Sequence, residues 1–185
     1  MRRILVSVCF LALALVLTGC ATSYSADFVS DPNAPYTLGS GDRVRVIVFG
    51  QESLSNSYAV DGSGHIEMPL IGIVSAQGKT TAALGADIEA KLRNGFLRDP
   101  HVSVEVEAFR PFFVLGEVTT PGQYPYVNGM TAETAVAIAG GFTPRAYKDT
   151  VDLTRTVNGQ QISGQVPIKN SVEPGDTIVV RERFF

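Results

Sequence analysis

The chain has 185 residues, which is enough for one domain or two small ones. Its formal net charge of −3 gives no indication of an electrostatic nucleic-acid surface. Its two histidines, His65 and His101, have no cysteine or carboxylate cluster at ligand spacing, so no metal site is expected. Nucleophiles, bases and carboxylates are scattered along the chain. The sequence therefore predicts no catalytic residue, no cofactor and no enzymatic activity, although a carboxylate pair formed only in space is invisible in sequence.

Residues 1–19 have the pattern of a secretory signal peptide. Two arginines precede an almost wholly apolar stretch, residues 4–17, that is too short for a comfortable membrane span. Leu17-Thr18-Gly19-Cys20 resembles a bacterial lipobox, in which cleavage precedes the cysteine and its thiol is acylated; an ordinary signal peptide with an incidental cysteine is the alternative. Lipidation of Cys20 would anchor the mature chain to a membrane, because each buried methylene adds roughly 0.8 kcal/mol of affinity. The mature chain, with a formal charge of −5, would keep this single cysteine and form no intramolecular disulfide.

Residues 20–35 are small, polar and proline-bearing, which predicts a flexible lipidated tether. After them, the alternation of valines with other residues predicts a strand over residues 43–49. Asp61-Gly62-Ser63-Gly64 has strong turn chemistry and predicts a hairpin within residues 58–73. A calcium loop at Asp61 is disfavoured, because no companion carboxylates lie at loop spacing.

A helix is expected to open at Gly78-Lys79-Thr80 and to end near Leu97, before Asp99-Pro100. Its apolar residues recur every four positions and form one stripe, which consists of Leu84, Ile88, Leu92 and Phe96. We expect this stripe to pack on the unit's own sheet; a partner-binding helix is the alternative. Alternation of valines with polar residues then predicts a half-buried strand over residues 101–107.

A tight turn between two strands is expected next. The apolar run of residues 112–118 predicts the first strand. Thr120-Pro121-Gly122-Gln123 predicts a type II turn with positive φ at Gly122. The returning strand, residues 123–127, should lie at a sheet edge or begin after Pro125, because this proline has no N–H to donate.

A short helix follows, and then a run of strands. Thr131 is a good N-cap for a helix over residues 132–139, which the following double glycine stops. Asn158-Gly159 is a strong signal for a type I′ hairpin. The remaining strands are expected over residues 151–157, 161–168 and 177–181.

The order of elements nearly repeats along the chain. Gly41-Asp42 and Gly175-Asp176 each precede a strand, and each half has a hairpin, one helix and a further strand. We therefore divide the structured chain near Arg110, into residues 36–109 and residues 110–185. The predicted fold class is α+β, with two small mixed-sheet units that each have one packed helix.

Taken together, these motifs resemble those of a known family. In the first unit the matching positions are Gly41-Asp42, Asp61-Gly62, residues 68–72, Gly78-Lys79-Thr80 and residues 97–104. In the second unit they are residues 114–118, residues 121–124, residues 139–143 and Pro174-Gly175-Asp176. The set resembles the bacterial outer-membrane polysaccharide export proteins, in which the first unit would be the polysaccharide export domain and the second a soluble-ligand-binding (SLBB) β-grasp domain.

The resemblance implies a function in the cell envelope, namely the export of a capsular polysaccharide or exopolysaccharide. Family members are lipoproteins that form homo-oligomeric rings in the periplasm and continue the path of an inner-membrane polysaccharide co-polymerase. The implied location is the outer membrane, with a lipid anchor at Cys20 and the protein facing the periplasm. A stand-alone polysaccharide-binding envelope lipoprotein with no conduit role is the alternative, and an envelope enzyme is a remote third.

The sequence departs from the longer relatives at its C-terminus. Those relatives carry a further β-grasp domain and a C-terminal amphipathic helix, and their helices together form a pore through the outer membrane. This chain, in contrast, reaches Phe185 directly after a strand. About twenty apolar residues are needed to span a membrane as a helix. The expectation is that the protein needs a separate outer-membrane β-barrel as its partner.

Four aromatic residues are candidates for contact with sugar, since aromatic faces suit the C–H side of a pyranose ring. They are Tyr124, Tyr126, Phe142 and Tyr147. The alternative is that these rings pack across strands and serve the fold.

Overall fold

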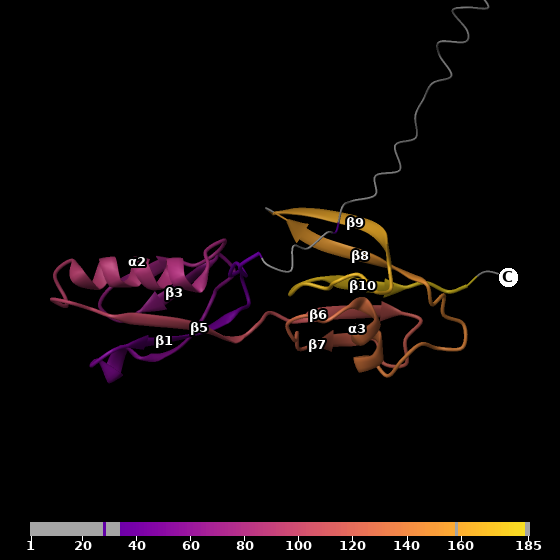
Figure 1. Cartoon of the computed structure of the whole chain (residues 1–185), viewed down its shortest axis with the longest axis horizontal. Coiled ribbons are helices and arrows are strands. Elements are labelled where there is room, and N and C mark those ends of the chain that lie inside the picture. The colour runs from indigo at the N-terminus through magenta and orange to yellow at the C-terminus, as the bar shows by residue number, and fades with distance from the viewer. Residues whose placement is uncertain (1–27, 29–33, 158, 184–185) are drawn as a thin grey trace, which may run out of the picture.

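The computed structural model describes residue 28, residues 34–157 and residues 159–183. These residues form two units that follow one another along the chain and lie end to end along the long axis of the molecule (Figure 1). Each unit has its own cluster of buried hydrophobic side chains. The signal peptide and Cys20 fall outside the described residues.

The first unit consists of two antiparallel sheets and one α-helix. Its elements, in chain order, are β1 (Arg43–Val48), the 3₁₀ helix η1 (Glu52–Leu54), β2 (Asn56–Ala59), β3 (His65–Met68), β4 (Gly72–Ser75), α2 (Thr81–Arg93) and β5 (Val102–Ala108). Strand β1 lies between β2 and β5, and β3 pairs with β4 in a separate two-stranded sheet. Every strand pairing that the structure describes in this unit is antiparallel.

Sequence periodicity accounts for the core of the first unit. The valines of β1 are fully buried while its arginines are exposed, as a period-two strand with one buried face requires. Helix α2 begins after Thr80, whose hydroxyl accepts a hydrogen bond from the backbone N–H of Ala83 (3.2 Å). Three residues of the predicted stripe, Leu84, Ile88 and Leu92, are fully buried. Packing of this stripe within the unit is therefore confirmed.

Two local predictions for the first unit are wrong. Strand β2 pairs with β1 rather than with β3, and the hairpin is formed by β3 and β4 around Leu70, which has a positive φ of 69°. Helix α2 ends at Arg93 rather than near Leu97, because Gly95 adopts a left-handed φ of 99°. Phe96 consequently lies beyond the helix and is half exposed.

The second unit is a five-stranded mixed sheet with one helix. Its elements are β6 (Phe112–Gly116), β7 (Gly122–Tyr124), α3 (Ala132–Ile138), β8 (Thr150–Val157), β9 (Gln160–Pro167) and β10 (Thr177–Val180). The strand order is β7-β6-β10-β8-β9, and β10 runs parallel to β6. This unit is β-grasp-like, because it combines a hairpin, a helix and a central pair of parallel strands. The predicted α+β fold class of the chain is confirmed.

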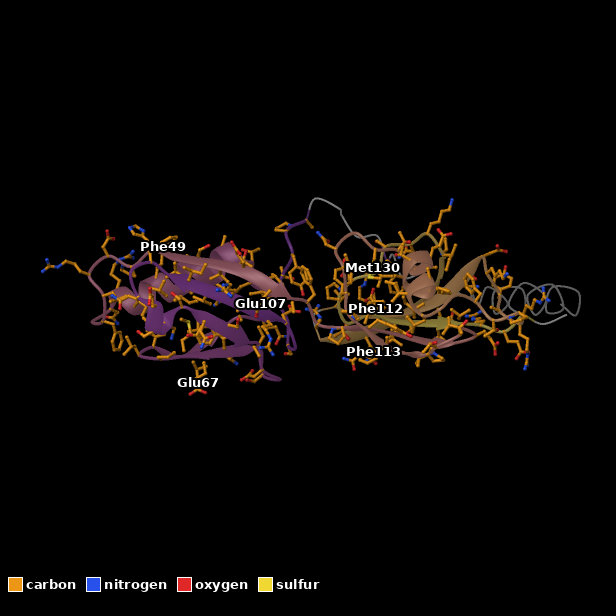
Figure 2. All side chains as sticks on the ribbon, turned by 90° about the horizontal axis from the view of Figure 1, so that it is seen from below. Phe49, Glu67, Glu107, Phe112, Phe113 and Met130 are labelled. Carbon is orange, nitrogen blue, oxygen red and sulfur yellow. The ribbon has the colours of Figure 1, made fainter. Side chains whose placement is uncertain are left out.

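Alternation along β6 separates core from surface. Phe112 points into the interior with Met130, whereas Phe113 points outward (Figure 2). Thr131 caps α3 as expected, and it forms a capping box with Thr134. Strand β7 is an edge strand that ends before Pro125, which agrees with the missing N–H of proline.

The β8–β9 hairpin has the expected register. Val157 pairs with Gln160, as a two-residue loop requires, and Gly159 has a positive φ of 79°. Residue 158 lies outside the described residues. The segment predicted to be a flexible tether includes Phe28, whose side chain is only 4% exposed and belongs to the core of the second unit.

The predicted type II turn at residues 120–123 is wrong. Gly122 does not adopt a left-handed φ; it begins β7 and pairs with Val114. The positive φ, 83°, belongs instead to Gly116 at the end of β6. A Cβ atom at Gly116 would overlap the backbone carbonyl oxygen of Val180 on the neighbouring strand. The second unit therefore depends on Gly116 for both its conformation and its closeness to β10.

These two glycines provide a matched test. Gly116→Ala should lower the free energy of unfolding by more than about 2 kcal/mol, since a left-handed alanine costs roughly 1–2 kcal/mol and the overlap adds to it. Gly122→Ala should change it by less than about 1 kcal/mol, because its Cβ would lie 3.9 Å from the nearest atom, in Tyr124. Urea unfolding followed by circular dichroism measures both. Similar losses in the two variants would contradict this account of the β6 end.

Candidate functional site at the joint between the units

Two turns of the same construction meet where the units join. In each turn a Gly-Asp pair precedes a strand, and the glycine has a positive φ, 93° in the first turn and 88° in the second. The carboxylate of Asp42 accepts the backbone N–H of Gly39 (2.8 Å), and that of Asp176 accepts the backbone N–H of Glu173 (2.7 Å). The near-repeat in the sequence is therefore also a repeat of turn geometry.

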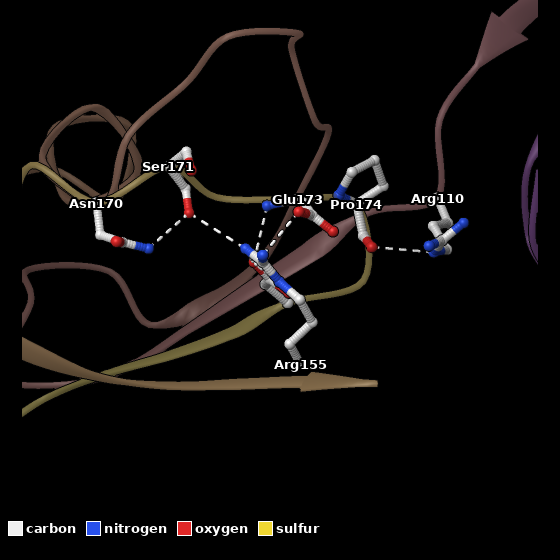
Figure 3. A network of polar contacts seen from close by, with 7 residues as sticks. Arg110, Arg155, Asn170, Ser171, Glu173 and Pro174 are labelled. Atoms are coloured by element: carbon white, nitrogen blue, oxygen red, sulfur yellow. Dashed lines mark hydrogen bonds and ion pairs between the residues drawn. The ribbon is translucent and has the colours of Figure 1, made fainter. Parts of the chain in front are cut away.

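Arg110, in the linker between β5 and β6, lies between the two turns. Its backbone N–H donates to Oδ1 of Asp42 (2.7 Å), and its Nη1 donates to Oδ2 of the same carboxylate (3.2 Å). On the other side, Nε donates to the backbone carbonyl of Pro174 (3.0 Å; Figure 3). One side chain thus binds the first unit through a charge and the second unit through a backbone carbonyl.

The carboxylate of Asp42 is fully buried, so it needs partners to remain inside the protein. The hydroxyl of Tyr36 donates to its Oδ2 (2.6 Å) and accepts from Nη1 of Arg110 (2.8 Å). Burial, together with the hydrogen bond to Asp42, raises the pKa of Tyr36 above its ordinary value. The phenol therefore stays protonated at neutral pH and remains a hydrogen-bond donor to Asp42.

The second turn holds a buried arginine of its own. Arg155, on β8, is only 6% exposed. It donates to Asp176 from Nε (3.0 Å) and Nη2 (2.7 Å), to the carboxylate of Glu173 from Nη1 (2.6 Å), and to the carbonyl of Ser171 from Nη2 (3.2 Å). Figure 3 shows Arg155 and Arg110 on either side of the segment formed by Glu173 and Pro174. Both arginines therefore brace the same turn.

Aromatic rings also cross the joint. Phe109 makes edge-to-face contacts with Tyr36 at 4.9 Å and with Tyr126 at 5.4 Å between ring centroids. Such geometry is favoured by the quadrupoles of the rings. The joint is thus held by a charged network and by an adjacent aromatic row.

A cavity of about 600 Å³ lies beside this network. It is lined by Ala34, Pro35, Tyr36, Thr37, Arg110, Tyr126, Asn128, Gly129, Met130, Ser171, Val172, Glu173 and Pro174. Its volume is in the range of small-molecule sites. Phenol, guanidinium, amide and carboxylate groups beside aromatic rings suit a hydroxylated ligand such as a sugar.

The four aromatic candidates for sugar contact do not form one site. Tyr126 lines the cavity, whereas the other three are absent from its wall. The ring of Tyr124 packs on Phe112 at 6.0 Å, and its hydroxyl donates to the carbonyl of Thr120. Phe142 packs against the core of the second unit, and Tyr147 is exposed. Sugar contact by any of them remains a prediction.

The residues that build the joint were missed by sequence reasoning. Asp42 was noted only in a Gly-Asp pair that precedes a strand and matches the family, and Arg110 only as the boundary between the units. Their hydrogen bonds span 68 positions of the chain, a distance at which local patterns carry no information. The burial of Arg155 could have been predicted from the sequence, because Arg155 falls on the same face of β8 as the buried Val151 and Leu153.

Neither membrane-spanning helices nor metal clusters are found in the part of the chain that the structure describes. No helix there is long and apolar enough to cross a membrane. Within the same residues, no group of three or more His, Cys, Asp or Glu side chains could hold a metal ion.

Comparison with known proteins assigns both units. Residues 30–107 match the family model described as polysaccharide biosynthesis/export protein, and residues 111–165 match the SLBB domain. The chain belongs to the polysaccharide export protein family. The resemblance found in the sequence motifs is thereby confirmed.

Curated relatives of this polysaccharide export protein agree with the assignment. It is 34% identical to the exopolysaccharide production protein ExoF of Rhizobium meliloti (strain 1021), over 84% of this chain and 36% of the relative. It is 27% identical to the EPS I polysaccharide export outer membrane protein EpsA of Ralstonia nicotianae, over 80% of this chain and 48% of the relative. It is 26% identical to the polysialic acid transport protein KpsD of Escherichia coli, over 82% of this chain and 29% of the relative. The chain spans less than half the length of each of these relatives.

Truncating Arg110 should destabilise the joint of this export protein. Arg110→Ala removes the charged hydrogen bonds to Asp42 and Pro174 and should cost about 2–3 kcal/mol of unfolding free energy. Arg45→Ala is the control and should cost less than about 1 kcal/mol, since Arg45 is exposed and lies 3.9 Å from Glu107. Chemical denaturation measures both. Equal losses would mean that Arg110 contributes no more than a surface arginine.

Proposed function

We propose that this chain is a periplasmic lipoprotein subunit of a capsular or exopolysaccharide export channel. The observation that carries the proposal is the succession of an export-family match and an SLBB match, one over each unit. The two units are joined through one network of hydrogen bonds, which supports their acting as a single body. The protein's own chemistry is binding and assembly, in keeping with the transport function of its family.

The proposal assigns a role to each segment. Residues 1–19 are a signal peptide, and residues 20–35 carry the lipid at Cys20. Residues 36–109 act as the polysaccharide export domain, and residues 110–185 act as the soluble-ligand-binding domain. Separate hydrophobic cores support this division, with Arg110 at the boundary.

A conduit requires many copies in one arrangement. A ring closes only when each subunit presents its two contacting faces at a fixed angle. The bonds of Arg110 to both units support such a fixed angle within each copy. We propose that the protein forms a homo-oligomeric ring at the periplasmic face of the outer membrane, between an inner-membrane polysaccharide co-polymerase and a separate outer-membrane channel.

One observation favours a second candidate function. The cavity beside the joint has the size of a small-molecule site and a mixed apolar and polar lining, and it needs only one copy of the chain. A stand-alone polysaccharide-binding lipoprotein would use this cavity without any ring. The two functions differ in assembly and in the effect of deletion on polymer secretion.

The test of export begins with a deletion strain. Deletion should abolish surface polymer, and plasmid-borne wild-type protein should restore it. Cys20→Ser should leave the protein unacylated and move it from the membrane fraction to the soluble periplasm, since acyl chains supply its membrane affinity. Immunoblots of cell fractions and mass spectrometry of the mature N-terminus measure these outcomes. Normal secretion in the deletion strain would refute the export role, and an unmodified wild-type N-terminus would refute the anchor.

The cavity is tested with the polysaccharide purified from the native strain. Tyr126→Ala should weaken binding about fivefold, which corresponds to about 1 kcal/mol for one lost aromatic contact. Tyr147→Ala is the control, because Tyr147 is an exposed aromatic residue outside the cavity wall. Isothermal titration calorimetry measures affinity, and thermal unfolding of each variant checks the fold. An equal loss in both variants would place the sugar site elsewhere.

A further inference from the structure

Phe28 is buried in the second unit although it lies in a segment that the sequence predicts to be a flexible tether. Its side chain is 4% exposed, and it belongs to the same hydrophobic cluster as Phe112, Met130 and Val172. The predicted acylation site, Cys20, is only eight positions earlier. The N-terminal segment therefore has a specific contact with the fold close to its lipid.

The contact is made with a side chain that several hydrogen bonds hold in place. The ring of Phe28 lies 5.8 Å from the guanidinium carbon of Arg155, in cation–π geometry. That guanidinium is held in place by Asp176, Glu173 and Ser171. Because the arginine is fixed by these bonds, it presents a flat, immobile face, and the aromatic ring covers it from water.

A second contact of the same segment lies on the other unit. Tyr36, eight positions after Phe28, donates to the buried carboxylate of Asp42 and accepts from Arg110. The chain is thus fixed first on the second unit and then at the joint. Of these two contacts, Phe28 is the one nearer to the lipid.

We propose that the surface formed by Arg155 and its apolar neighbours is a docking site for the chain's own N-terminal segment, with Phe28 as the inserted residue. This inference rests on the proposed acylation of Cys20. An extended chain covers at most about 3.6 Å per residue, so eight residues keep Cys20 within about 29 Å of Phe28. If Phe28 were free, the sixteen residues to Tyr36 would allow about 58 Å. Docking therefore holds the part of the second unit around Arg155 within roughly the shorter of these two distances from the lipid.

The docking site is tested without the lipid. A soluble mature chain with Cys20→Ser carries spin labels at Ser25→Cys and Lys169→Cys, and double electron–electron resonance gives the distance distribution between them. A single narrow distribution is expected, and Phe28→Ala should at least double its width. Tyr147→Ala, which removes an exposed aromatic residue from the same unit, should leave the width unchanged. A broad distribution in the parent chain would overturn the docking site.

The occupant is tested by mixing. Chains labelled only at residue 25 and chains labelled only at residue 169 are combined before measurement. The proposal expects no defined distance in the mixture, because each segment occupies its own chain. A narrow distribution between different chains would show that a neighbouring copy supplies Phe28, and it would overturn insertion within one chain.

The effect on the membrane is tested with acylated protein on vesicles of phosphatidylethanolamine and phosphatidylglycerol that contain an acceptor-labelled lipid. A donor dye is placed either at Lys169→Cys in the second unit or at Arg98→Cys in the first. Energy transfer to the lipid should be at least twofold greater from position 169 than from position 98. Phe28→Ala should reduce this ratio of the two transfer efficiencies toward one. Equal transfer from both positions in the parent protein would overturn the inferred closeness of the region around Arg155 to the membrane. Failure of the parent protein to bind vesicles would refute the proposed acylation, whereas the spin-label experiment would still decide the docking site.

Discussion

The ion pair between the fully buried carboxylate of Asp42 and the half-buried side chain of Arg110 is the interaction on which the rest of this structure depends. A fully buried carboxylate needs a cation and several hydrogen bonds, and the linker arginine supplies a guanidinium and a backbone N–H together. The space for that guanidinium is left by glycines. A Cβ at Gly39 would overlap its Nη1, and a Cβ at Gly175 would lie 2.9 Å from its Nε. Glycines from both units therefore make room for one side chain.

The same turn serves two different purposes in the two units. In the first, its aspartate faces the joint and takes the linker arginine. In the second, Asp176 faces inward and fixes Arg155, whose outer face is covered by Phe28. The carbonyl of Pro174 in this second turn still reaches the joint through Arg110. One local geometry, used twice, thus connects Phe28, both units and the linker.

Local patterns in the sequence predicted local structure well and distant contacts poorly. The stripe of α2, the cap at Thr131 and the register after Val157 follow from rules that act within a few residues. The partner of β2 was wrong because strand pairing is decided by the whole unit, and Gly116 was passed over because its constraint comes from Val180, far along the chain. The joint combines both difficulties, since Asp42 and Arg110 are 68 positions apart and neither belongs to a recognised motif of charged residues.

The joint bears on the choice between a conduit and a stand-alone binder. A buried ion pair gains little net stability over well-packed apolar residues, because both charges must leave water. What such a pair provides is one allowed geometry, since a shifted linker would leave the Asp42 carboxylate without its cation. A single-copy binder gains little from a fixed angle between its domains, whereas a ring cannot close without one. The physical design of the joint therefore favours the proposed assembling subunit over the proposed stand-alone binder.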